Sequence, residues 1–197
     1  MNQIGAVILA AGASTRMGQP KQLLEYQGKS LISRITGIAI EVIEEPVVVV
    51  IGAYSNLISK ELKGMNAQIV KNPEWTSGIA TSIRTGLLEI RSLSPQLRAL
   101  FFLVCDQPFV TAGLLTEMLL AMDQSHKNIV ACSYNDTLGT PVLIARQYFK
   151  ELLLLRFHDG AKKIIQRHPM AVQPVPFPNG NVDIDTLQDY ISLQSNN

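Results

Sequence analysis

Two cations follow the first apolar run of the chain within one glycine-containing stretch. Directly after the run AVILA come Gly12, Ser14, Arg16, Gly18 and Lys21. Glycine lets the backbone come close to a ligand, arginine can bind two phosphate oxygens at once, and lysine supplies a movable positive charge. This set suits a loop that holds a triphosphate while a nucleophile attacks one phosphorus. We therefore predict a phosphate-binding loop here, although any one of these residues alone would indicate only a solvated surface loop.

The spacing of this loop excludes two common nucleotide-binding motifs. A Walker loop has the form GxxxxGK[ST], whereas Gly12 and Gly18 are six positions apart and Gln19 follows the second glycine. A dinucleotide-binding loop has the form GxGxxG, and Ala13 and Ser14 break that spacing. The loop therefore belongs to neither class.

Acidic residues that could hold magnesium occur at two places. Asp106 ends the apolar run FFLVC, and ligands of α/β sheets bind beyond the carboxyl ends of the strands. Asp183 and Asp185 alternate with apolar residues in GNVDIDTLQDY and so share one face of an extended segment. Because Mg²⁺ is commonly held by one or two carboxylates plus substrate phosphates, we predict a Mg²⁺ site formed by Asp106 and Asp185. The alternatives are a turn role for Asp106, a helix-capping role for the later pair, and Asp183 as the second ligand.

Apolar runs alternate with helical patterns along the chain, which is typical of a mostly parallel sheet flanked by helices. Six strands are predicted, at Ile4–Leu9, Pro46–Ile51, Ala67–Val70, Leu100–Val104, Ile129–Ser133 and Pro141–Ile144. Six helices are predicted, at Leu31–Ile43, Leu57–Leu62, Gly78–Leu93, Thr111–Met122, Arg146–Leu155 and Ala161–His168. Ser30 and Thr111 stand where N-caps are expected. No linker or repeat interrupts the pattern, so residues 1–197 are expected to form a single α/β domain.

Composition narrows the class of protein further. The 197 residues include 17 Lys+Arg against 16 Asp+Glu, and this balance of charge leaves no footprint for binding nucleic acid. The two cysteines, Cys105 and Cys132, lie in apolar runs without metal-ligand spacing and are expected to be reduced core residues. No signal peptide and no run of membrane-spanning length is apparent, so we expect a soluble cytoplasmic protein with no membrane partner.

The stretch LAAGASTRMGQPKQLLEYQGKSL closely resembles the LAAGxSxRMGxxK signature of MobA-like nucleotidyltransferases, and within them most resembles the molybdenum cofactor cytidylyltransferases. The resemblance implies a Rossmann-like domain, similar to nucleotide-diphospho-sugar transferases, that transfers a nucleoside monophosphate to a phosphorylated small molecule and releases pyrophosphate. It implies that Arg16, Lys21 and Asp106 are catalytic. It also implies that the nucleotide lies against the loop residues Leu9, Ala10, Ala11, Gly12, Ser14, Arg16 and Lys21.

Two later segments resemble other family elements, and a third departs from the family. KNPEWTSGIATSIRTGL matches a segment that borders the base and ribose, which implies nucleotide contacts for Asn72, Gly78 and Ser82, although Trp75 alone would more simply be a packed aromatic. RFHDGAKKII resembles a GDxG element, for which an N-cap role of Asp159 is the plainer reading. LGTPVLIAR departs from the family, since Thr140 stands where many relatives have histidine.

The resemblance favours one nucleotide and leaves the acceptor open. The guanylyltransferase branch typically has two glycines where this chain has Ala11-Gly12, and this favours CTP over GTP. Alternatives are the same chemistry with GTP, or with methylerythritol phosphate or a sugar phosphate as the acceptor. A further alternative is a non-catalytic accessory protein that hands molybdenum cofactor to a molybdenum hydroxylase, which would then be its partner.

Overall fold

The computed structural model describes residues 3–43 and 46–195. Its centre is a seven-stranded sheet with the order β5-β4-β1-β6-β8-β7-β9. The strands are β1 Ile4–Ala10, β4 Val47–Ile51, β5 Gln68–Lys71, β6 Ala99–Val104, β7 Ile129–Tyr134, β8 Thr137–Ala145 and β9 Val172–Pro176. β1 lies between β4 and β6 and is parallel to both, so the predicted mostly parallel α/β sheet is confirmed. β8 runs antiparallel to both β6 and β7.

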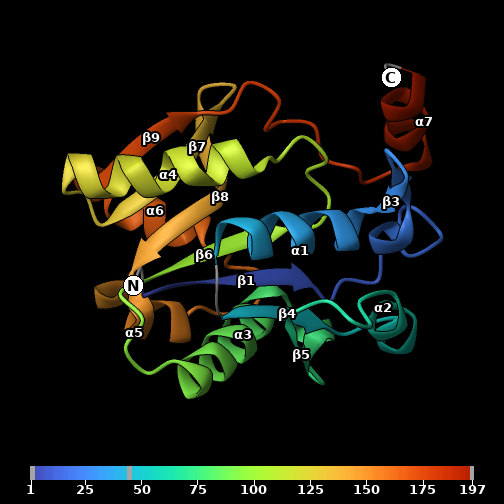
Figure 1. Ribbon diagram of the computed structural model, residues 1–197, viewed down its shortest axis with the longest axis horizontal. Helices are drawn as coiled ribbons and strands as arrows, with labels where there is room; N and C mark the ends of the chain where they lie inside the picture. Colours follow the sequence, from blue (N-terminus) through green and yellow to red (C-terminus); the bar gives the residue numbers. More distant parts are fainter. Residues whose placement is uncertain (1–2, 44–45, 196–197) are drawn as a thin grey trace.

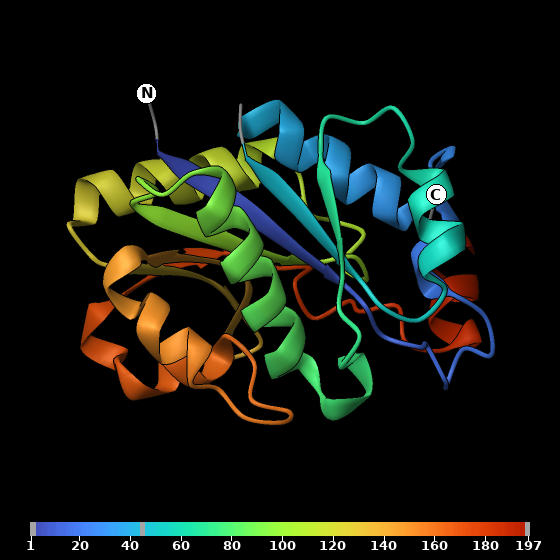
Figure 2. The same cartoon turned by 90° about the horizontal axis from the view of Figure 1, so that it is seen from below.

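Helices cover both faces of the sheet, as Figures 1 and 2 show. The helices are α1 Leu31–Val42, α2 Ser55–Glu61, α3 Ile79–Leu93, α4 Ala112–Ser125, α5 Phe149–Leu153, α6 Lys162–Arg167 and α7 Leu187–Ser195. α1 and α4 pack on one face, whereas α3, α5 and α6 pack on the other. The predicted N-caps are confirmed, because the hydroxyls of Ser30 and Thr111 accept from the amides of Ser33 and Leu114 at 3.2 Å.

The strand sequences explain the two-sided core. Along β1, Ala6 and Ile8 face α1 and its neighbours, while Val7 and Leu9 face α3. Successive side chains of a strand point to opposite faces, so a continuous apolar run is needed where both faces are covered. Because β1 and β6 are parallel neighbours, their carboxyl ends lie at the same edge of the sheet. At this edge the predicted loop follows β1 and Asp106 follows β6.

The structure differs from the predicted elements at an edge strand, a hairpin and a helix. β9 contains Pro174 and Pro176 and lies at the edge beside β7, the position in which proline is tolerated because one side of the strand needs no ladder partner. A short hairpin, β2 Glu25–Tyr26 with β3 Lys29–Ser30, precedes α1. The region expected as one helix at Arg146–Leu155 divides into a 3-10 turn, Arg146–Tyr148, followed by α5.

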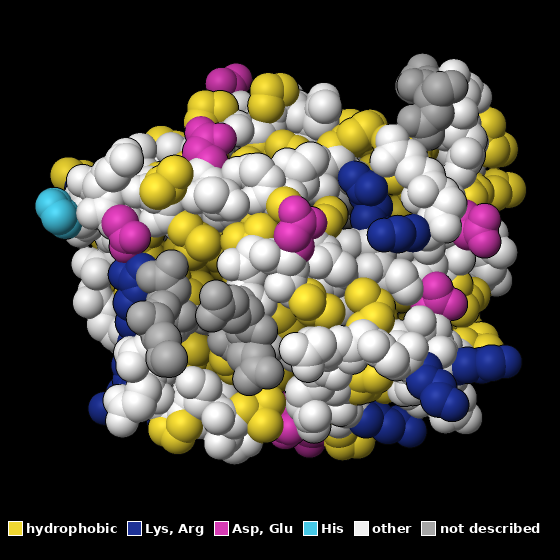
Figure 3. Space-filling model, in the orientation of Figure 1, with side chains coloured by type: hydrophobic (Ala, Val, Ile, Leu, Met, Phe, Trp, Pro, Cys, Tyr) yellow, Lys and Arg dark blue, Asp and Glu magenta, His cyan; other side chains and the backbone are white. Residues whose placement is uncertain are grey.

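The charged side chains, the helices and the cysteines of the structure agree with the expectations from the composition. Lys and Arg side chains are interspersed with Asp and Glu on the face shown in Figure 3. Within residues 3–43 and 46–195, no helix is long and apolar enough to cross a membrane. Cys105 and Cys132 are free and buried, as predicted, and burial raises the pKa of each thiol to about 12.

Candidate active site

A cavity of about 230 Å³ opens at the carboxyl ends of β1 and β6. The end of β1 and the loop after it form one wall, the segment from Trp75 into α3 forms a second, and the end of β6 forms a third. The lining residues are Leu9, Ala10, Ala11, Gly12, Lys21, Gln22, Trp75, Ile79, Ser82, Val104, Cys105 and Asp106. The structure thus gathers most of the residues predicted from the sequence around one space.

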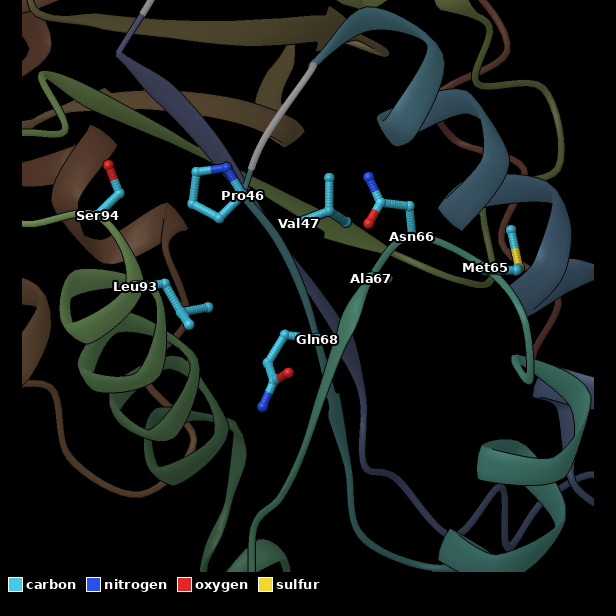
Figure 4. Close-up of a pocket in the computed structure, with 8 residues that line it drawn as sticks. All are labelled: Pro46, Val47, Met65, Asn66, Ala67, Gln68, Leu93 and Ser94. Carbon is cyan, nitrogen blue, oxygen red and sulfur yellow. The ribbon is translucent and has the colours of Figure 1, made fainter.

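A larger cavity, of about 440 Å³, lies at the other end of the sheet and is shown in Figure 4. Gln68 of β5 and Leu93 at the end of α3 point toward each other across it. Of the residues that the structure describes, it is lined by Pro46, Val47, Met65, Asn66, Ala67, Gln68, Leu93 and Ser94, none of which is charged. It lies at the amino ends of β4 and β5, away from the predicted phosphate loop, and its described lining offers no cation to a phosphate.

The phosphate loop is folded around backbone positions that glycine and serine supply. Gly18 has φ +73° and Ser14 has φ +51°, and the Ser14 carbonyl accepts from the amide of Met17 at 2.9 Å. Gly12 is different, because its φ lies outside the left-handed region and a Cβ there would meet nothing within 4 Å. The fold itself therefore does not require glycine at position 12, whereas close approach of a ligand would.

Four charged residues from three distant parts of the chain meet beside this loop. The Lys21 ammonium Nζ lies 2.6 Å from Asp106 Oδ2 and 2.8 Å from Asp185 Oδ1. Arg16 NH2 lies 2.8 Å from Asp185 Oδ2, and the Arg16 side chain is 69% exposed. The amide of Ile184 donates to the carbonyl of Asp106 at 2.9 Å, which fastens the C-terminal segment to the end of β6. The predicted catalytic and metal-binding residues thus form one cluster.

The cluster determines the charge of its members. Burial alone would lower the pKa of Lys21, but the charges and hydrogen bonds of Asp106 and Asp185 outweigh it and raise that pKa. Partial burial of Asp185 is likewise outweighed by Lys21 and Arg16, which lower its pKa. Asp183 behaves in the opposite way: burial, reinforced by the charges of Asp106 and Asp185, raises its pKa to about 6.

The structure shows which residues cap α7, and therefore whether Asp185 has the helix-capping role that the sequence left open. The start of α7 is capped by Thr186 and Asp189, whose carboxylate accepts from the Thr186 amide at 2.7 Å while the Thr186 hydroxyl accepts from the Asp189 amide at 3.3 Å. Asp185 therefore does not cap the helix, and its carboxylate is directed to Lys21 and Arg16. The pattern TxxD one residue later was the sequence signal for this assignment.

Magnesium fits the carboxylates that converge here. In the described part of the chain, no group of three or more His, Cys, Asp or Glu residues could hold a metal ion. Asp106 and Asp185 nevertheless direct one oxygen each at a single cationic atom, Lys21 Nζ. Two carboxylates with the remaining ligands from phosphate oxygens and water is a usual arrangement for Mg²⁺. The carboxylates of Asp106 and Asp185 thus fit a metal ion shared with a triphosphate, and the choice between Asp185 and Asp183 as the second ligand stays a prediction.

The wall formed by residues 72–82 is held together by its own hydrogen bonds. The Asn72 side chain is 1% exposed; its Nδ2 donates to the hydroxyls of Thr81 at 2.8 Å and Ser82 at 3.0 Å, and its Oδ1 accepts from the Glu74 amide at 2.9 Å. Ser82 lines the cavity, so a nucleotide contact there stays a prediction. The nucleotide contact predicted for Asn72 also stays a prediction. Because its Nδ2 already donates to the hydroxyls of Thr81 and Ser82, Asn72 would act on a nucleotide by orienting Ser82.

Gly78 and Trp75 both pack closely against neighbouring residues in the same wall. Gly78 has φ +109°, and a Cβ on it would overlap the carbonyl of Phe157. Trp75 both lines the cavity and packs against Gly52, where an added Cβ would come within 2.7 Å of it. The N-cap predicted for Asp159 is wrong, because α6 begins after Ala161 and has no side-chain cap. The chain turns at Gly160 before the helix, so Asp159 lies too early to cap it.

One residue of the site escaped the sequence reading. Gln22 follows Lys21 in a short 3-10 helix, Lys21–Leu23, and is 1% exposed. Its Nε2 donates to the carbonyls of Ala10 at 3.1 Å and Gly12 at 2.8 Å. The available signal was a polar residue immediately before the apolar pair Leu23 and Leu24, where an unpaired side chain would be costly to bury.

The fold and the charged strand-end loop together define an α/β nucleotide-handling protein. The model of the MobA-like NTP transferase domain matches residues 6–172, and the chain belongs to this family.

Similar proteins cover nearly the whole chain. A probable molybdenum cofactor guanylyltransferase of Nostoc sp. is 26% identical over 98% of this chain and 92% of its own length. Nicotine blue oxidoreductase of Paenarthrobacter nicotinovorans is 29% identical over 96% of both. The molybdenum cofactor cytidylyltransferase of Escherichia coli is 22% identical over 98% and 97%. The crystal structure of Rv0371c from Mycobacterium tuberculosis H37Rv has a TM-score of 0.84 and 28% identity, covering 98% of each chain.

Proposed function

We propose that this protein transfers CMP from CTP to the terminal phosphate of molybdopterin and releases pyrophosphate, with Mg²⁺ as cofactor. The observation that carries the proposal is the position of Lys21 between Asp106 and Asp185, with Arg16 beside them, at the mouth of a strand-end cavity. Both cations come from the loop that follows β1. A triphosphate in this cavity would lie against two cations and two carboxylates able to share a metal ion with it.

The residues of the chain act by positioning and by electrostatic stabilisation. Arg16 can bind two phosphate oxygens, while the flexible Lys21 side chain can follow the charge that develops on the departing pyrophosphate. An oxygen of the acceptor phosphate attacks the α-phosphorus of the nucleotide, and the bond from that phosphorus to the β-phosphate oxygen breaks. The acceptor phosphate is already anionic, so the step requires no side-chain base. Mg²⁺, held by Asp106 and Asp185, would neutralise charge on the triphosphate.

The divalent cation has independent support. A second crystal structure of Rv0371c is described as a complex with manganese, and it has a TM-score of 0.77 and 26% identity to this chain. Mn²⁺ and Mg²⁺ both prefer oxygen ligands. We therefore propose Asp106 and Asp185 as metal ligands, and Mn²⁺ as a practical probe for them.

The preference for CTP rests on Ala11. Ala11 lines the cavity, and its carbonyl accepts from the Ala53 amide at 3.0 Å, which restrains the backbone at this position. A base that must lie against this backbone meets a methyl group where a second glycine would leave room. Discrimination by shape is modest, about 1–3 kcal/mol, so we expect CTP to be preferred over GTP by roughly tenfold or more.

The acceptor is proposed from the names of the relatives, which include both guanylyl- and cytidylyltransferases of the molybdenum cofactor. Thr140, which replaces the histidine common among such proteins, lies on β8. If the acceptor is instead another phosphorylated small molecule, the nucleotide half of the proposal is unaffected. Transfer of the product to a molybdenum hydroxylase would follow in the cell.

The test is pyrophosphate release with each of the four nucleoside triphosphates, with and without molybdopterin. We expect release only when acceptor, Mg²⁺ and nucleotide are all present, and fastest with CTP. Faster release with GTP would replace the nucleotide assignment. Absence of release with all four nucleotides would contradict the proposed function and make a different reaction, such as that named for the Paenarthrobacter relative, the next to assay.

A further inference from the structure

Gln22 is almost completely buried, and its amide bonds three separate points of the phosphate loop. Its Nε2 donates to the carbonyl of Ala10 at the end of β1, at 3.1 Å, and to the carbonyl of Gly12, at 2.8 Å. Its Oε1 accepts from the hydroxyl of Ser14 at 3.4 Å. A buried amide that uses both hydrogens on carbonyls of one loop holds that loop in a single shape, since releasing either carbonyl would leave it unpaired.

The same contacts join the loop to the catalytic lysine. Ser14 accepts from the backbone amide of Lys21 at 3.2 Å and donates to Gln22, the next residue. Lys21 and Gln22 share one 3-10 turn, Lys21–Leu23. The bond between Ser14 and the Lys21 amide does not use the Gln22 side chain, so the base of the Lys21 side chain keeps this contact when Gln22 is replaced.

The direction of the two carbonyls matters for an anionic ligand. A loop binds phosphate through backbone N–H groups, and carbonyl oxygens directed at the phosphate would repel it. Gln22 Nε2 engages the carbonyls of Ala10 and Gly12 and compensates their negative ends. Gly12 needs this restraint, because nothing lies within 4 Å of the position a Cβ would take and its backbone has no packing on that side.

We propose that Gln22 is a positioning residue that holds the Ala10 and Gly12 carbonyls away from the bound triphosphate and so sets the affinity of the phosphate loop for nucleotide. The inference rests on the proposed function, because it assumes that the loop binds a nucleoside triphosphate. Gln22 acts through the loop backbone, equally before and during the reaction. Its loss should therefore raise KM for nucleotide and leave kcat nearly unchanged.

The experiment compares Gln22→Met with the wild-type enzyme. Methionine has a similar size and shape but neither donates nor accepts strongly, so the substitution removes the three hydrogen bonds without leaving a large cavity. We expect KM for CTP and the directly measured Kd for CTP with Mn²⁺ to rise tenfold or more, while kcat changes less than threefold. An unchanged KM and Kd in a folded variant would overturn the inference.

A matched control removes the same group elsewhere. Gln107 is also a buried glutamine, 4% exposed, and its Nε2 donates to the carbonyl of Gly180 at 2.9 Å, outside the phosphate loop. Gln107→Met should lower the denaturation midpoint but leave the Kd for CTP within threefold of wild type. A rise in Kd equal to that of Gln22→Met would show that loss of any buried amide loosens the site, and would also overturn the inference.

A second variant keeps the test usable if Gln22→Met does not fold. Gln22→Glu has the same size and keeps an oxygen for the Ser14 hydroxyl, but it loses the amide donor that faces Ala10 and Gly12. We expect a rise in Kd of tenfold or more, and a folded variant with the wild-type Kd would refute the role. If wild-type enzyme itself binds no nucleotide, the proposed function fails; if wild type binds normally and both variants do as well, only the role of Gln22 fails.

Discussion

Replacing Lys21 by alanine should make the protein bind Mn²⁺ more tightly in the absence of nucleotide, even though it removes a group that we propose to be catalytic. The ammonium stands 2.6 Å from Asp106 and 2.8 Å from Asp185, at the point where their oxygens converge. The two carboxylates raise the pKa of Lys21, so the ammonium stays charged throughout the neutral range. A divalent cation held by the same two oxygens must therefore displace this ammonium, and Lys21→Ala removes the competitor.

The size of the effect follows from the contacts that the metal must break. A hydrogen bond to a charged group contributes about 1.5–3 kcal/mol when it is well buried. The three side chains are 16–33% exposed, so solvent screens both contacts and we take about 1–2 kcal/mol for the pair together. This corresponds to a five- to thirtyfold tighter binding of Mn²⁺.

The assay is a titration of Mn²⁺ followed by electron paramagnetic resonance of the free ion, at constant ionic strength. Lys150→Ala is the matched control, because Lys150 is exposed on α5 and its loss changes the net charge by the same amount. We expect the control to bind Mn²⁺ as wild type does and Asp106→Asn to bind it poorly. Lys21→Ala with an affinity equal to or weaker than wild type would refute the competition between ammonium and metal.

Further predictions concern the same loop and the core. Asp106→Asn should abolish Mg²⁺-dependent pyrophosphate release without changing the melting temperature, and an unchanged Mg²⁺ requirement would leave Asp106 as a turn residue only. Arg16→Ala should lower kcat/KM by about a hundredfold, the usual cost of one preorganised charged contact, whereas Arg98→Ala, which breaks an exposed pair with Asp123, should not. Gly12→Ala should melt as wild type does, because its Cβ meets nothing, yet bind CTP at least tenfold more weakly; tight binding would show that no ligand approaches there. Cys132 should react with iodoacetamide at pH 8 only in denaturant. Because burial raises its pKa to about 12, its contribution to the free energy of unfolding should be complete below pH 9 and decline between pH 9 and 12. Urea unfolding curves measured across that pH range would show the decline.

Local patterns in the sequence were sufficient for the strands that form the middle of the sheet. β1, β4 and β6 are continuous apolar runs, because both of their faces are covered, and such runs are easy to recognise. The edge strand β9 carries two prolines and was missed, since its pairing with β7 depends on a neighbour about forty residues earlier. Local pattern cannot report such a partner.

The site was predictable in its residue types and only partly in its contacts. The loop and Asp106 could be placed because each follows a recognisable strand, and ligands collect at such ends. Asp185 was predicted with Asp183 left open, because the orientation of the Asp185 carboxylate depends on Ile184 bonding to Asp106 and on Thr186 and Asp189 capping α7 without Asp185. Gln22 was missed because a buried glutamine reveals its role only through the carbonyls it reaches.

The charged cluster is assembled from two parts of the chain that differ in their relation to the family. Lys21 and Asp106 lie within residues 6–172, the region that the family model matches, whereas Asp185 lies beyond it. The C-terminal segment contacts Asp106 through one backbone bond and the loop through two ion pairs of Asp185. It is also held by Ile184 and Leu193, which are buried in a cluster with residues of the loop and of α1, and by bonds from side chains of α7 to the Glu25 carbonyl. Because those ion pairs use the same cations that would hold the triphosphate, nucleotide binding and the position of this segment must be linked. We therefore expect bound nucleotide to weaken the ion pairs of Asp185 with Arg16 and Lys21.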